Sequence, residues 1–398
     1  MERDQSNGGS GIYMLEFNSH TNHPKPSERE WALQAIKNIE ADYRRSADTH
    51  LIKLNIPKLT KAGIDLYLKD ESTHPSGSLK HRLARSLVLY GICNGWIREG
   101  MPIVEASSGS TAISEAYFAQ LIGNPFVAIA PKATATGKIR EIEALGGEVH
   151  LVEPRQIYRE AERLAAELGG HYVDQFTYAE RATDWRGNNN IAQSLFSQMK
   201  LERFPAPRWV VMSAGTGGTT ATIGRYIRLH TEDYANTQLC VVDPENSVFH
   251  EFYRNRDHSI TRSKPSLIEG IGRPRVEPSF LPDVIDRMLD IPDAASIATI
   301  RWLEGVILRK CGGSTGTNLY GALALAKEMM QNEEDGSIVT LLCDSGERYL
   351  DTLYNDEWVA SKKLDILPYM QKLIDFTEVD GHAKIIGTSA HSCTPPLR

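Results

Sequence analysis

The sequence predicts an α/β protein whose sheets are mostly parallel and whose chain is organised in two halves. Short apolar stretches of strand length alternate with helical stretches of about a dozen residues, which implies right-handed strand–helix–strand crossovers. Glycine pairs at 146–147 and 169–170 end two of these helical stretches. The alternation restarts after residue 185, and a chain of 398 residues is too long for one comfortable core. Two α/β domains are therefore expected.

The first half opens with a helix over residues 28–45, where Trp31, Leu33, Ile36 and Ile39 recur at helical spacing. Further strands and helices then alternate. Strands are expected at residues 64–69, 102–106, 125–130 and 148–152, and helices at residues 83–95, 111–122, 138–145 and 158–168. This order predicts a first domain over residues 26–185.

The second half repeats the arrangement. Strands are expected at residues 209–214, 238–243 and 337–343, and helices at residues 190–200, 219–230, 296–309 and 317–330. Residues 253–282 are rich in Arg, Ser and Pro, which predicts a long surface excursion. A second domain over residues 186–370 follows, flanked by a disordered or arm-like N-terminus at residues 1–25 and a loosely attached tail at residues 371–398.

Bulk composition limits the classes of function. The net charge of −7 argues against nucleic acid as a partner, since nucleic-acid binding usually needs a basic face. No stretch reaches the roughly 18 apolar residues that span a bilayer, and the N-terminus lacks an apolar signal core. We therefore expect a cytoplasmic protein with no membrane partner. The five cysteines include no C-x-x-C pair, so neither disulfides nor a metal site are expected.

One lysine occupies a distinctive position. Lys80 follows the small, polar run Ser76-Gly77-Ser78-Leu79, and the first turns of a helix follow it. A lysine at such a helix start is held at a defined place, although most runs of this kind are plain helix entries. Two loops further along the chain suit the same ligand and strengthen the interpretation.

The first of these loops joins a predicted strand to a predicted helix and reads Gly215-Thr216-Gly217-Gly218-Thr219. Glycines let successive backbone N–H groups point inward, the helix adds its positive N-terminus, and threonines add hydroxyl donors. These features suit a phosphate group. Thr220 stands where a dinucleotide motif would have its third glycine, and no nucleoside-triphosphate loop occurs, so a smaller phosphate is preferred.

The second loop, Ser107-Ser108-Gly109-Ser110-Thr111, also follows a strand and opens a helix. Its hydroxyl and N–H groups suit a carboxylate, and simple capping of the helix is the alternative. Ser345 follows the last predicted strand, where ligands of open α/β sheets collect. The run from Gly312 to Gly316 matches the G-x-S-x-G elbow of serine hydrolases, but a helix precedes it rather than the required strand, which disfavours a hydrolase.

Together these segments resemble the fold-type II pyridoxal-phosphate enzymes, in the branch of cysteine synthase and cystathionine β-synthase. The resemblance runs from about Ile56 to Leu353. It implies two three-layer αβα domains like those of the tryptophan synthase β subunit, pyridoxal 5′-phosphate as cofactor, a small amino-acid substrate and a homodimer.

The resemblance also assigns roles to residues. Lys80, in P-S-G-S-L-K-H-R, matches the lysine that forms an imine with the cofactor. The loop of Gly215, Thr216, Gly217, Gly218 and Thr219 matches the phosphate loop, and that of Ser107, Ser108, Gly109, Ser110 and Thr111 matches the loop that grips the substrate carboxylate. Gln175 resembles a glutamine that also faces the carboxylate. Ser345 resembles the hydroxyl partner of the pyridine nitrogen, and residues 269–272 resemble a G-I-G segment beside the cofactor.

The carboxylate loop departs from the usual T-S-G-N-T-G of the family. Ser110 replaces the asparagine that bonds the 3′ oxygen of the cofactor, and Ala112 replaces the last glycine. The run S-S-G-S-T-A resembles the subgroup similar to cysteine desulfhydrases. This favours β-elimination on L-cysteine, giving hydrogen sulfide, pyruvate and ammonia. The alternatives are a β-replacement synthase making cysteine or cystathionine, a serine or threonine dehydratase, and a catalytically silent binding protein.

Overall fold

The computed structural model describes residues 27–377. The expectation for residues 1–25 and most of the expected tail lie outside these residues. Within residues 27–377 the strands form one six-stranded and one four-stranded sheet, with the orders β1-β2-β10-β7-β8-β9 and β5-β4-β3-β6. Every described pairing in both sheets is parallel except that of β1 with β2. The α/β fold with mostly parallel sheets is confirmed.

The elements follow the expected alternation closely. The strands are β1 (His50–Leu54), β2 (Ile64–Asp70), β3 (Ile103–Glu105), β4 (Phe126–Pro131), β5 (Gly147–Val152), β6 (His171–Tyr172), β7 (Trp209–Ser213), β8 (Gln238–Pro244), β9 (Arg287–Ile291) and β10 (Gly336–Leu342). The α-helices are α1 (Glu28–Arg44), α2 (Pro57–Lys61), α3 (Lys80–Cys93), α4 (Ser110–Ile122), α5 (Thr136–Ala144), α6 (Ile157–Glu167), α7 (Gln175–Ala182), α8 (Ile191–Met199), α9 (Gly218–Leu229), α10 (Thr231–Tyr234), α11 (Phe249–Asn255), α12 (Asp293–Ile307), α13 (Gly313–Gln331), α14 (Asp356–Ser361) and α15 (Leu367–Thr377).

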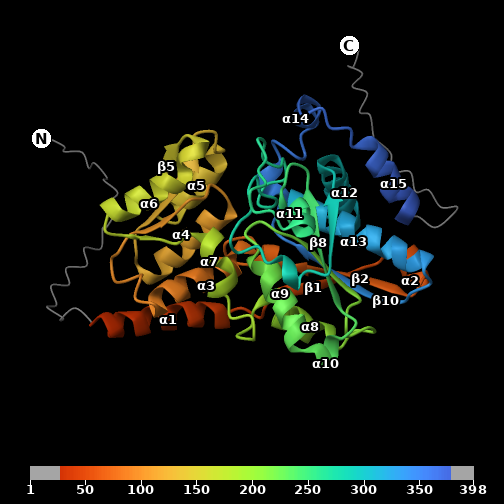
Figure 1. The fold of residues 1–398 in the computed structure, drawn as a ribbon, viewed down its shortest axis with the longest axis horizontal. Helices are drawn as coiled ribbons and strands as arrows, with labels where there is room; N and C mark the ends of the chain where they lie inside the picture. The colour runs from red at the N-terminus through yellow and green to blue at the C-terminus, as the bar shows by residue number, and fades with distance from the viewer. Residues whose placement is uncertain (1–26, 378–398) are drawn as a thin grey trace, which may run out of the picture.

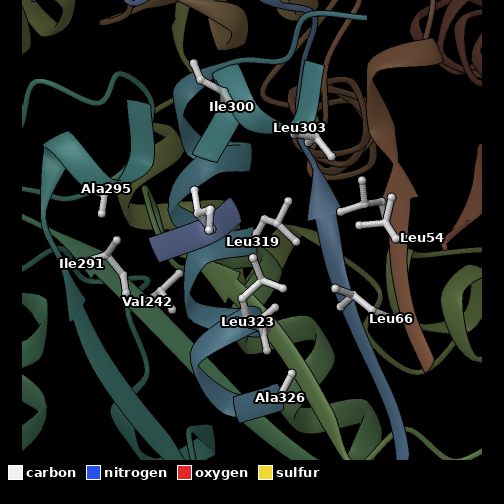
Figure 2. Close-up of a cluster of buried hydrophobic side chains, with 14 of the residues drawn as sticks. Leu54, Leu66, Val242, Ile291, Ala295, Ile300, Leu303, Leu319, Leu323 and Ala326 are labelled. Carbon is white, nitrogen blue, oxygen red and sulfur yellow. The ribbon is translucent and has the colours of Figure 1, made fainter. Parts of the chain in front are cut away.

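Helices cover both faces of the larger sheet. Residues of α12 and α13 pack on one face, and Figure 2 shows Leu303, Leu319 and Leu323 of these helices meeting Leu54 and Leu66 of β1 and β2. Residues of α8, α9 and α11 form the core on the other face. β2 and β10 consist entirely of buried residues, as expected for parallel strands covered on both faces.

The smaller sheet is also sandwiched by helices. One of its faces packs against α1, α3 and α4, and the other packs against α6. This lobe lies beside the larger one in Figure 1, with α1, α3, α4 and α6 on the left of the view. Each sheet therefore forms the middle of three layers, as the resemblance implies.

Sheet membership departs from the expected division of the chain at residue 185. β1 and β2 come from the first half of the sequence but pair in the sheet of the second half, where β2 lies beside β10. The apolar, fully buried β2 needs neighbours on both sides, and β1 and β10 provide them. Residues 50–70 therefore contribute two strands to the larger sheet, and the division into domains at residue 185 stays a prediction.

The C-terminal end of the described chain is also more firmly packed than expected. Residues 371–377, placed in a loose tail by the sequence, continue α15, and Leu373 is buried against the core of the larger lobe. α15 packs on α12. Among residues 27–377, no helix is both long and apolar enough to cross a bilayer.

Candidate active site

A cavity of about 660 Å³ opens between the two lobes, within the usual size of a small-molecule site. It lies beyond the carboxyl ends of β3, β7 and β10, where parallel strands direct their following loops. Its lining includes Lys80, all of Ser107–Thr111, four residues of the glycine-rich loop, Gln175 and the 269–272 segment. Segments far apart in the sequence thus converge on one space.

Lys80 begins α3 and is held by the strand that ends beside it. The N–H of Leu79 donates to the carbonyl of Cys343 (2.8 Å), and Ser78 forms a bridge with Asp344. The preceding turn requires Gly77, whose φ of +74° lies in the left-handed region. Burial lowers the pKa of the Lys80 amine, which favours its neutral, nucleophilic form.

The glycine-rich loop lies directly against the lysine. A Cβ built on Gly215 would lie 2.2 Å from the carbonyl oxygen of Gly270 and 3.6 Å from Lys80 Nζ. Gly217 has a φ of +95°, and a Cβ there would lie 2.4 Å from the carbonyl oxygen of Ser279. These positions can only be glycine, and together they form a narrow cradle at the N-terminus of α9.

The loop predicted to grip a carboxylate also lines the cavity. Ser110 and Thr111 begin α4, so their backbone N–H groups lie at the positive end of a helix. Thr111 Oγ1 donates to Gln175 Oε1 at 2.9 Å, which joins the loop to the start of α7. The predicted carboxylate residues are therefore brought together in one wall of the cavity.

Arg348 adds a contact that the sequence did not indicate. Its guanidinium donates from Nη1 to Ser110 Oγ (3.2 Å) and from Nη2 to the carbonyl of Ser76 (3.1 Å). It also pairs with Glu141 of α5 at 2.7 Å. Arg348 thus places a positive charge beside the serine that replaces the family asparagine.

Ser345 lies just after β10, close to the cavity but outside its lining. Its hydroxyl caps a short 3-10 helix by accepting from the N–H of Glu347 (3.3 Å), and it is not among the cavity-lining residues. Ser314, at the start of α13, does line the cavity and hydrogen-bonds the thiol of Cys343. In the sequence, Ser314 is noticed only within the G-x-S-x-G match of residues 312–316. The glycines on either side of it are the feature that could have indicated a ligand-binding loop.

Comparisons with known proteins agree with this geometry. The family described as "Pyridoxal-phosphate dependent enzyme" matches residues 45–344. The chain belongs to this family. Its cofactor is pyridoxal 5′-phosphate, and its fold is that of the fold-type II enzymes.

The relatives include enzymes of sulfur amino-acid metabolism. The chain is 58% identical over 351 residues to L-cysteine desulfhydrase Cds1 of Mycobacterium tuberculosis, covering 87% of this chain and 95% of the relative. It is 30% identical over 345 residues to cysteine synthase 1 of Neurospora crassa, covering 82% and 87%. The crystal structure of O-ureido-L-serine synthase matches with a TM-score of 0.67 at 25% identity, covering 78% of this chain and 96% of that one.

The residues present fit the cofactor. Neighbouring backbone lies so close to Gly215 and Gly217 that a side chain at either position would collide with it. The loop therefore presents bare backbone, which suits the binding of a phosphate by N–H groups. An amine with a lowered pKa stands beside the cradle, ready to condense with an aldehyde. A hydroxyl, Ser314, is available on the same cavity wall for a ring nitrogen.

Proposed function

We propose that this protein is a cysteine desulfhydrase, which eliminates hydrosulfide from L-cysteine and yields pyruvate and ammonia. The 58% identity to L-cysteine desulfhydrase Cds1 over most of both chains carries the proposal. The serine in place of asparagine at position 110 supports it, because synthases of the family use the T-S-G-N-T-G form. Pyridoxal phosphate supplies an electron sink for the pair of electrons released at Cα.

The chain's own residues divide the work. Lys80 would hold the cofactor, and its amine, whose pKa is lowered by burial, would remove the proton from Cα. Gly215, Thr216, Gly217, Gly218 and Thr219 bind the cofactor phosphate. Ser107, Ser108, Gly109, Thr111 and Gln175 bind the substrate carboxylate, and Ser110 lies on the 3′-oxygen side together with Arg348.

Ser314, which lines the cavity, is proposed as the partner of the ring nitrogen, instead of Ser345. The neutral hydroxyl of Ser314 would not protonate that nitrogen as a carboxylic acid can, so it would leave the bound cofactor a moderate electron sink. This favours prompt loss of a β-substituent over a long-lived carbanion. Elimination and β-replacement share this requirement and differ only in whether a second nucleophile enters.

The deciding experiment incubates the holoenzyme with L-cysteine alone and measures sulfide and pyruvate. Equal amounts of the two products are expected without any co-substrate. The cysteine synthase relative favours β-replacement as the second candidate. If O-acetylserine with sulfide turns over far faster than cysteine alone, the synthase is the main activity and the desulfhydrase proposal fails.

We further propose that the enzyme is cytoplasmic, as the sequence leads us to expect, and a homodimer, as the family resemblance implies. Two copies of the chain, each containing both lobes, would then form the dimer. Light scattering of the purified holoenzyme gives the mass directly. Twice the chain mass of 44.4 kDa is expected, and a single chain mass at micromolar concentration would contradict the dimer.

A further inference from the structure

Two glutamates lie behind the carboxylate loop and have no part in the function proposed above. Glu105 is the last residue of β3, and Glu115 lies in α4. Both side chains are fully buried, at 0% exposure. Fully buried carboxyl groups are rare unless they are paired or hydrogen-bonded, so their contacts indicate why they are here.

Glu105 joins two segments of the site. Its Oε1 accepts from the N–H of Ala106 (2.6 Å), and its Oε2 accepts from the N–H of Gln175 (3.1 Å). Gln175 in turn accepts from Thr111 through its side chain. Glu105 therefore links the start of the carboxylate loop to the start of α7, where one of the proposed carboxylate ligands begins.

Glu115 meets Glu105 from the opposite side. The two carboxyl groups interact directly, and neither oxygen of Glu115 accepts a hydrogen bond from a donor among residues 27–377. Both groups are acceptors when ionised, so a hydrogen bond between them requires a proton on one of them. Glu105 already accepts two N–H groups and suits the ionised form, whereas Glu115 accepts none and suits the protonated form.

The surroundings agree with one proton shared by the pair. Burial raises the pKa of both carboxyl groups, and the charge of Glu105 raises the pKa of Glu115 further. Lys80 of α3 faces the pair and lowers the pKa of Glu115, while Asp174 before α7 raises that of Glu105. Tyr172 of β6 faces Glu105, whose charge raises the pKa of the phenol. Two adjacent ionised carboxylates would repel strongly in this site.

We propose that Glu115 is a positioning residue, whose shared proton ties α4 to Glu105 and so keeps Thr111 and Gln175 in place for the substrate carboxylate. Thr111 and Glu115 are four residues apart and lie on the same face of α4. Two successive turns of α4 are thus joined to neighbouring elements, Thr111 to Gln175 of α7 and Glu115 to Glu105 of β3. The inference rests on the proposed carboxylate role of this loop.

Two substitutions of the same position test the proposal in the holoenzyme. Glu115→Gln keeps a donor to Glu105 but cannot titrate, and Glu115→Leu fills the space without a donor. The readout is the Kd for L-serine, measured from the cofactor absorbance, which needs no turnover. Glu115→Gln should bind within about twofold of wild type, and Glu115→Leu about tenfold more weakly, as loss of one charge-assisted hydrogen bond predicts.

The pH dependence and a second ligand sharpen the test. The affinity of wild type for L-serine should fall at alkaline pH, because the shared proton is lost, and it should fall more steeply than the affinity of Glu115→Gln. Both proteins are measured in the same buffers, so that titration of L-serine itself cancels. L-serinamide, which lacks the carboxylate, should bind all three proteins equally. Infrared difference spectra should show a protonated carboxyl band in wild type that Glu115→Gln lacks.

The proposal is overturned if Glu115→Leu binds L-serine like wild type, or if Glu115→Gln is weakened as much as Glu115→Leu. Equal weakening toward L-serinamide would also overturn it, because a general structural defect would then explain the loss. Sulfide release from L-cysteine by wild type is measured separately. Its absence would refute the desulfhydrase function and leave the binding comparison unaffected.

Discussion

At the scale of single residues, backbone proximity at the glycine cradle gives the sharpest prediction. In Gly215→Ala, the new methyl group would lie 2.2 Å from the carbonyl oxygen of Gly270, and backbone cannot move aside easily. We expect the purified variant to contain less than about a tenth of the cofactor, measured by absorbance relative to protein. Gly137→Ala is the control, since a Cβ there meets nothing within 4 Å. Full cofactor content in Gly215→Ala would contradict the cradle.

The identity of the ring-nitrogen partner is tested by a pair of serine variants. Ser314→Ala removes a cavity-lining hydroxyl and should shift the cofactor absorbance and lower kcat by about tenfold or more. Ser345→Ala removes only a cap of a 3-10 helix and should leave the spectrum unchanged. The opposite pattern would restore Ser345 to the role that the sequence suggested.

At the residue scale, the sequence predicted which segments meet at the cavity where their position depends on the backbone. Lys80 and the loops at 107–111 and 215–219 stand next to strand ends, and parallel strands bring such loops to one edge. The role of Ser345 stays a prediction: its side chain lies outside the cavity lining, and the direction of a side chain after a strand depends on the turn that follows. Glu115 was missed, although a glutamate among the apolar residues of α4 is a signal that could have been noticed.

At the scale of elements, a buried ion network fixes the start of α3. Arg82, two residues beyond Lys80, donates to Glu71 (2.6 Å) and to Asp48 (2.9 Å), and Glu71 is fully buried. Arg82→Met should lower the free energy of unfolding by about 3–5 kcal/mol, because the buried Glu71 loses its guanidinium partner and, among residues 27–377, keeps only the hydrogen bonds with Thr49 and His74. Urea denaturation measures this, and a loss below about 1 kcal/mol would contradict it.

The matched control is Arg98→Met, since Arg98 pairs with Glu28 at 3.6 Å where both side chains are largely exposed. Surface pairs contribute little because water screens them. This variant should change the free energy of unfolding by no more than about 1 kcal/mol.

The same network predicts how stability changes in acid. Burial raises the pKa of Glu71, but Arg82 and His74 outweigh it and hold that pKa well below its ordinary value of 4.5. The folded state therefore favours the ionised form, so the stabilisation is complete above that value and is lost as pH falls below it. Urea midpoints of wild type should decline below about pH 4.5, and less steeply in Glu71→Gln. Equal slopes would contradict the assignment.

The two edge strands β1 and β9 were not predicted from the sequence, because they lack a regular pattern of buried residues. β1 has exposed residues at both His50 and Lys53, and β9 shows only two buried positions. Such edge strands are defined by the neighbour with which they pair, which a single sequence does not reveal. The membership of β1 and β2 in the larger sheet depends on the same long-range pairing.

At the scale of the whole molecule, the cavity between the two lobes joins them through one ligand. The carboxylate loop and α3 come from the smaller lobe, and the glycine cradle comes from the larger one (Figure 1). Removing the cofactor should therefore destabilise the protein as a unit, by about 2.7 kcal/mol when the wild type carries cofactor at about 100 times its Kd. Thermal unfolding of holo and apo protein measures this. An unchanged Tm would contradict a cofactor shared by both lobes.

The attachment of the cofactor to one lysine is the claim on which the rest depends. Borohydride reduction of the holoenzyme fixes the cofactor to the amine that carries it, and peptide mass spectrometry then locates it. We predict the phosphopyridoxyl group on the peptide that contains Lys80. Its appearance on Lys138, which also lines the cavity, or on any other lysine would contradict the account.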